Sequence, residues 1–131
     1  MTIEEFIAAE AVLPFAWGES DCAMTACRWV EAVTGIHPIA EYGRLYSNER
    51  QAREWLAERG SVAVGMNRVM RHCGFAKTAA PRAGDVGLIV DSGKVCVGIH
   101  AGLVWFSRDE NGLIGAPLNA CWKAWRVECP A

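Results

Sequence analysis

The sequence predicts a single α+β domain in which helices come first and an antiparallel sheet follows. The length of 131 residues suits one domain with one core. Apolar residues recur at helical spacing in the first part, about 1–75, whereas short strands and turn signals fill the second part, about 84–128. Helices and strands that are segregated along the chain in this way are typical of α+β rather than alternating α/β folds.

Two helices are predicted before residue 36. The first begins at a capping box opened by Thr2 and ends at Pro14. The second is capped by Ser20 or Asp21 and stopped by Gly35. The apolar positions are Ile3, Phe6, Ile7 and Ala11 in the first helix, and Ala23, Ala26, Cys27, Val30 and Val33 in the second.

Two further helices are predicted between residues 48 and 74. Asn48 with Gln51 opens the third helix, and Gly60 closes it. Ser61 begins the fourth helix, which ends at Gly74. The inward residues are Trp55 and Leu56 in the third helix, and Val62, Met66, Val69 and Met70 in the fourth.

Five strands are predicted after Pro81, because short apolar runs alternate there with turn residues. Their ranges are 86–90, 95–101, 103–108, 113–118 and 122–127. The turns DSGK at 91–94 and DENG at 109–112 are strong hairpin signals. Neighbouring strands are therefore expected to pair antiparallel.

The bulk properties argue against several classes of function. The net charge is −2, from 13 basic and 15 acidic residues, and no basic stripe predicts a nucleic-acid partner. No apolar run approaches the ~18 residues of a membrane span, so no membrane insertion is expected. The acidic start MTIEEFIAAE does not resemble a signal peptide, so we expect synthesis and folding in the bacterial cytoplasm.

Six cysteines, at positions 22, 27, 73, 96, 121 and 129, show no tight disulfide framework. There is no CxxC pair, and His72 and Cys73 are adjacent rather than spaced as metal ligands. We therefore expect mostly buried free thiols, no metal site and no cofactor.

Cys22 is the candidate nucleophile because it lies in the first turn of the second predicted helix. Unpaired backbone N–H groups and the helix dipole favour an anion there, so we expect a lowered thiol pKa. A cysteine nucleophile also needs a base, usually a histidine. The chain offers His37 in a loop, His72 near the end of the fourth helix and His100 in the second strand. Each of these residues also suits a purely structural role.

Several short motifs occur together along the chain: PFAWGESDC at 14–22, VTG at 33–35, GDV at 84–86, CVGIHAG at 96–102 and AWRV at 124–127. In this combination, nearly the whole chain resembles short phage and prophage tail proteins that are similar to NlpC-type cell-wall cysteine peptidases. The resemblance implies a papain-like fold, in which a cysteine heads a helix and a histidine lies on the facing sheet. It implies Cys22 as the catalytic residue, with Trp17, Gly18 and Asp21 in the substrate cleft.

The sequence departs from this family where the catalytic base is expected. Cys96 stands in the place of the histidine, and a thiol with a reference pKa of about 8.5 is a poor base. His100 lies on the same strand face but ~13 Å further along the strand. It could therefore act as the base only with a bulge in the strand or a different substrate geometry. Ser107 matches the third polar position and cannot orient an imidazole as the family's residue does.

Several interpretations therefore stay open. The chain is a degenerate enzyme that serves in the virion tail with other tail-tip or hub proteins, or Cys22 survives because it suits a helix start. Alternatively, it is an active peptidase that cleaves peptidoglycan stem peptides with His100 or a partner's histidine as base. A thiol redox protein using Cys22 and Cys96 belongs to a different class. A sugar-binding module would use exposed members of the six tryptophans.

Overall fold

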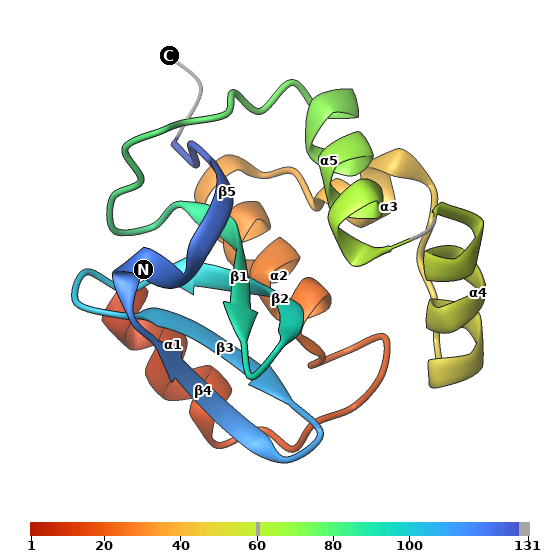
Figure 1. Ribbon diagram of the computed structural model, residues 1–131, viewed down its shortest axis with the longest axis horizontal. Helices are drawn as coiled ribbons and strands as arrows, with labels where there is room; N and C mark the ends of the chain where they lie inside the picture. Colours follow the sequence, from red (N-terminus) through yellow and green to blue (C-terminus); the bar gives the residue numbers. More distant parts are fainter. Residues whose placement is uncertain (60, 129–131) are drawn as a thin grey trace.

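The structure is a computed structural model that describes residues 1–59 and 61–128. The described helices are α1 (Ile3–Ala11), α2 (Cys22–Thr34), α3 (Pro38–Tyr42), α4 (Glu49–Arg59) and α5 (Val62–His72). The strands are β1 (Val86–Asp91), β2 (Lys94–His100), β3 (Trp105–Asp109), β4 (Gly112–Ala116) and β5 (Cys121–Trp125), with a 3-10 helix, η1 (Leu118–Ala120), before β5. The predicted α+β class is confirmed, with all α-helices before the strands (Figure 1).

The five strands form one antiparallel sheet in the order β4–β3–β2–β1–β5. The turn between β1 and β2 has positive φ at Ser92 (49°) and Gly93 (79°). Two such residues make the primed turn that matches the twist of a hairpin, and Asp91 pairs with Lys94 beside it. Since β5 returns to the open side of β1, β4 and β5 are the two edge strands.

The main core lies between the helices and one face of the sheet. α2 packs against β2 and β3, and the core includes Trp29, Met66, Leu88 and Val97 (Figure 1). A smaller cluster takes the alternate residues of the strands: Ile89, Cys96, Trp105, Ala116 and Ala124. This division is what two faces of a sheet require. Of the six tryptophans, four are buried, as the sequence led us to expect of most: Trp29, Trp55, Trp105 and Trp125.

The first two helices begin and end close to the predicted signals. The Thr2 hydroxyl accepts the N–H of Glu5 at 3.1 Å, and Gly35 ends α2 with a φ of 82°. The cap of α2 is Asp21 and not Ser20, whose hydroxyl instead donates to the carbonyl of Pro14. Within residues 1–59 and 61–128, no helix has the length and hydropathy needed to cross a bilayer.

The third and fourth predicted helices are α4 and α5. Asn48 Oδ1 accepts the N–H of Gln51 at 2.9 Å, and the Ser61 hydroxyl caps the first turn of α5. Gly60, which was predicted to close the third helix, lies outside the described residues, and so does the side chain of Leu56.

His37 lies in the short connection after α2, as predicted, but the helix α3 that begins at Pro38 was not predicted. Pro38 occupies the first turn, where its missing N–H costs nothing, and His37 Nδ1 accepts the N–H of Ala40 at 3.3 Å. A helix of five residues is too short to show an apolar period, so the sequence pattern does not indicate it.

Three strand boundaries differ from the prediction by two residues, and several others differ by one. The strand predicted at 103–108 begins only at Trp105, because Gly102 has a φ of 99° and opens a turn. The strand predicted at 113–118 ends at Ala116, because Pro117 leads into η1. The last strand begins at Cys121 and ends at Trp125, two residues before its predicted end.

Asp85 links the segment that precedes β1 to the segment that follows β5. The carboxylate is fully buried and accepts the N–H groups of Val127 at 3.0 Å and Arg82 at 2.9 Å. Its Oδ2 also pairs with Arg126 Nε at 3.1 Å, and its carbonyl accepts the N–H of His100 at 2.8 Å. A buried carboxylate with several charge-assisted bonds holds these segments strongly.

Substitution of Asp85 by Ala is expected to lower the free energy of unfolding by about 3 kcal/mol, because Arg126 loses its ion-pair partner and two N–H groups lose their acceptor. Denaturant unfolding measures this loss. The control is Glu128→Ala, which removes only an exposed 2.9 Å pair with Arg82 and should cost less than about 0.5 kcal/mol. An equal loss of unfolding free energy in the two variants would contradict the stabilising role of Asp85.

Candidate functional site

A cavity of about 270 Å³ opens beside the first turn of α2, and its lining includes residues of α4, α5, β2 and β3. Its apolar walls include Phe15, Trp17, Tyr46, Trp55, Val62 and Val95. Charged residues line the remaining parts: Arg53, Lys94, Arg108, Asp109 and Glu110. Asp21, Cys22 and Cys96 also line the cavity, so the structure brings these three predicted site residues together.

Asp21 fixes the position of Cys22 because its carboxylate closes the start of α2. Oδ1 accepts the N–H of Met24 at 2.9 Å and the hydroxyl of Tyr46 at 2.8 Å. Oδ2 accepts the N–H of Gly18 at 2.8 Å. The side chain is therefore an N-cap, as the sequence suggested, and it also ties the loop before α2 to Tyr46.

Gly18 has a backbone role, whereas Trp17 faces the cavity. Gly18 has a φ of 82°, and a Cβ there would lie 2.4 Å from the carbonyl oxygen of Tyr46. Only glycine fits this approach. Gly18 does not itself line the cavity, but Trp17 does, packed edge-on against Phe15 with 5.2 Å between ring centroids.

The Cys22 thiol is not activated, contrary to the expectation from its place at a helix start. Burial raises its pKa from 9.0 to about 12, and the nearby Asp21 and Cys96 raise it further. Backbone hydrogen bonds from Val97 and Ala23 act in the opposite direction and do not overcome the burial. An apolar cavity disfavours a thiolate more than the helix terminus favours it.

Cys96 lies on β2 opposite Ile89 and shares the cavity with Cys22. Burial also raises the pKa of Cys96. The position where the resemblance implied a histidine thus faces Cys22 but carries a second protonated thiol. Neither group accepts a proton from the other at neutral pH.

All three histidines lie in the described ranges, and none of them lines the cavity. The buried His100 packs edge-on against Trp105, with 5.0 Å between centroids, and its Nδ1 accepts the N–H of Gly102 at 3.1 Å. His72 packs against Tyr42, and His37 caps α3.

Ser107 is also absent from the cavity lining. It is buried in β3, and its hydroxyl donates to the carbonyl of Val97 at 2.8 Å. The bond links β3 to β2 directly beside Cys96. Ser107 therefore stabilises the strand that carries Cys96 and orients no imidazole.

The lining residues that the sequence did not predict include the buried Tyr46 and Arg108. Tyr46 is buried against Asp21, and burial together with the Asp21 charge raises the pKa of its hydroxyl. Arg108 is buried and donates to the carbonyl oxygens of Glu10 and Leu13 at the end of α1. A charged residue inside a predicted strand was the available signal for Arg108, whereas nothing local marked Tyr46.

The described cysteines are all free thiols: Cys22, Cys27, Cys73, Cys96 and Cys121. Cys129 lies outside the described residues. Within the described part of the chain, no three His, Cys, Asp or Glu residues gather closely enough to hold a metal ion. The chemistry available in the cavity is therefore that of two thiols, backbone N–H groups, aromatic rings and the charged side chains in its lining, with no histidine among them.

The fold and cavity define an α+β protein in which a cysteine heads a helix and faces a second cysteine on the sheet. Residues 1–127 match the family described as Domain of unknown function (DUF6950), and the chain belongs to that family. No curated protein and no solved structure matches the chain.

Alkylation of Cys22 by iodoacetamide, followed by mass spectrometry of its peptide, is expected to be slow at pH 7. The rate should rise with pH without a plateau below pH 10, because the thiol pKa is about 12. Cys96→His should increase the rate at pH 7 by about tenfold or more, since an imidazolium beside a thiol lowers its pKa by at least one unit.

Cys96→Ser is the matched control, because it changes the same position without adding a base, and it should leave the rate near that of the unmodified chain. A plateau below pH 8.5 in the unmodified protein would contradict this account of the cavity.

Proposed function

We propose that this chain is a phage or prophage tail-tip component with NlpC-like, papain-type architecture that has lost peptidase activity and acts in tail assembly. The joint motifs support the family relationship. The observation that carries the proposal is the pair formed by Cys22 at the head of α2 and Cys96 in the facing position on β2. The nucleophile position is retained, and the base position holds a thiol.

The energetics of the cavity favour a scaffold over an enzyme. With a pKa of about 12, only about one Cys22 thiol in 10⁵ is ionised at pH 7. Peptide cleavage by a cysteine requires a base within hydrogen-bond reach and an acid for the leaving amine. His100, the in-chain candidate, already accepts a backbone N–H and packs on Trp105. An active peptidase would require a histidine from another protein.

The partners implied by this proposal are other tail-tip or hub proteins. The aromatic cavity offers them, or a peptidoglycan stem peptide, an apolar recess with charged residues in its lining. Binding of a wall peptide without cleavage is compatible with the backbone N–H groups of Val97 and Ala23 at the Cys22 sulfur. The site of action that follows is the virion tail.

Genetic complementation tests this role. In the phage or prophage that encodes the chain, deletion is expected to abolish infectious particles and leave incomplete tails in electron micrographs. Both the natural chain and Cys22→Ala should restore plaque formation, because assembly does not use the thiol. Normal particles after deletion would contradict the tail role. Failure of a folded Cys22→Ala protein to restore plaques would contradict the loss of activity.

A thiol redox protein is the second candidate, favoured by the common placement of Cys22 and Cys96 in one cavity. With hydrogen peroxide as oxidant, the two thiols would lose two hydrogen atoms, form one disulfide and release two waters. The raised pKa of both thiols slows the attack by either one.

Mass spectrometry after mild peroxide treatment distinguishes this candidate. The proposed scaffold predicts no Cys22–Cys96 linkage and slow oxidation of both thiols. Rapid formation of that linkage, with Cys27 left reduced as the buried internal control, would favour the redox function instead.

A further inference from the structure

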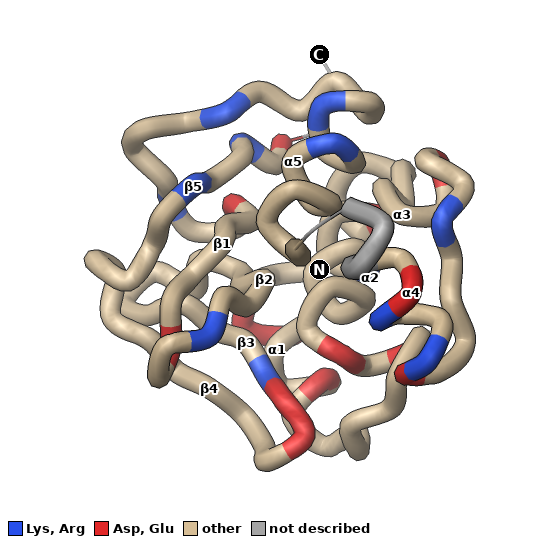
Figure 2. The backbone as a smooth tube through the Cα atoms, turned by 45° about the vertical axis from the view of Figure 1, so that its right-hand side comes forward, with Lys and Arg blue, Asp and Glu red and all other residues tan. Residues whose placement is uncertain are grey.

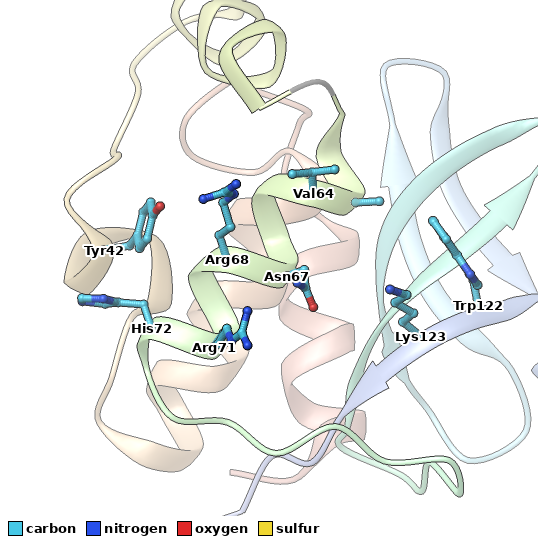
Figure 3. A pocket seen from close by; sticks show the side chains of 9 residues that line it. Tyr42, Val64, Asn67, Arg68, Arg71, His72, Trp122 and Lys123 are labelled. Atoms are coloured by element: carbon cyan, nitrogen blue, oxygen red, sulfur yellow. The ribbon is translucent and has the colours of Figure 1, made fainter.

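A second hollow, of about 460 Å³, lies between α5 and β5, away from the cysteine cavity. Its basic residues are Arg68, Arg71 and His72 on α5 and Lys123 on β5. Figure 3 shows Asn67 and Lys123 approaching each other from opposite walls, with Trp122 beside Lys123. An adjoining hollow of about 410 Å³ shares Asn67 and Arg71 and adds Lys77. We name the two hollows together the α5–β5 groove.

In the described part of the chain, every charged residue that lines the α5–β5 groove is basic. No aspartate or glutamate lines either hollow in the described part of the chain. Arg68, Arg71, Lys77 and Lys123 form no ion pair with any described residue. The whole chain has a net charge of −2, so this basic face is a local property (Figure 2). Unpaired cations around a concavity attract an anionic partner.

Two further observations describe what the partner must offer. Trp122 is 56 % exposed on an edge strand, with Lys123 Nζ 5.2 Å from its ring centroid. The same hollow is lined by Arg68 and Arg71, and tryptophan and arginine are enriched in the centres of protein interfaces. Asn67 Oδ1 is shielded from solvent and lacks a hydrogen-bond partner among the described residues. A partner that enters between α5 and β5 and carries an N–H donor would satisfy it once the Asn67 side chain turns toward the groove.

We propose that the α5–β5 groove binds an acidic segment of a partner protein. Carboxylates pair with Arg68, Arg71 and Lys123, an apolar side chain covers Trp122, and a backbone N–H reaches Asn67. A nucleic acid is disfavoured, because nucleic-acid-binding domains are typically basic overall, whereas this chain has a net charge of −2. The inference depends on the groove alone and not on the fate of the cysteine cavity.

Fluorescence anisotropy with a labelled peptide of alternating Glu and Leu residues tests the proposal. Binding should weaken as salt rises, and Arg68→Glu with Arg71→Glu should reduce affinity by about tenfold or more, since two favourable charge pairs become repulsive. The control, Arg50→Glu with Arg82→Glu, changes the net charge equally on other surfaces and should alter affinity by less than about twofold. Circular dichroism verifies folding of both variants.

Two outcomes would overturn the proposal. One is an equal loss of peptide affinity in the two double variants, which would mean unspecific attraction. The other is tighter binding of an oligothymidylate of equal charge than of the peptide, which would assign the groove to nucleic acid. Amide NMR shifts confined to α5 and β5 on peptide addition, diminished in Arg68→Gln with Arg71→Gln, would support it independently of charge reversal.

Discussion

The Asp21 carboxylate is the constraint on which the rest of the cysteine cavity depends. Its two oxygens accept hydrogen bonds from the N–H groups of Met24 and Gly18 and from the hydroxyl of Tyr46. These bonds set the first turn of α2, the loop that brings Trp17 to the cavity and the wall formed by Tyr46. A cysteine that follows such a cap is held in one place whether or not it performs chemistry.

Several residues of the short sequence motifs have structural roles in this architecture. The Gly84 carbonyl accepts the indole N–H of Trp29 at 2.7 Å, which ties α2 to the start of β1. Asp85 then holds Arg126 of the closing AWRV motif. Within the motifs, Cys22 therefore differs from these structural residues, because its thiol faces a cavity. Desolvation raises the pKa of both the Cys22 and the Cys96 thiol, so both stay protonated at neutral pH.

Much of the fold was predictable because local signals in the sequence determine where helices begin and end and where the chain turns. The caps at Thr2 and Asp21, the glycine stop at Gly35 and the turn after Asp91 are all determined by neighbouring residues. α3 was not predictable, because a helix of five residues is too short to show an apolar period. The raised pKa of Cys22 was not predictable either, since it arises from the walls that distant segments build around the helix start. The pairing of Cys22 with Cys96 followed from the resemblance, whereas the contribution of Tyr46 required the structure.

The central claim is that the cavity retains a nucleophile position without a working base. The most direct measurement is the release of soluble stem peptides from purified peptidoglycan, with the natural chain and Cys22→Ala compared at pH 7 and at the same concentration. The account predicts that both proteins release no more peptide than buffer does. Release by the natural chain that Cys22→Ala abolishes would contradict it.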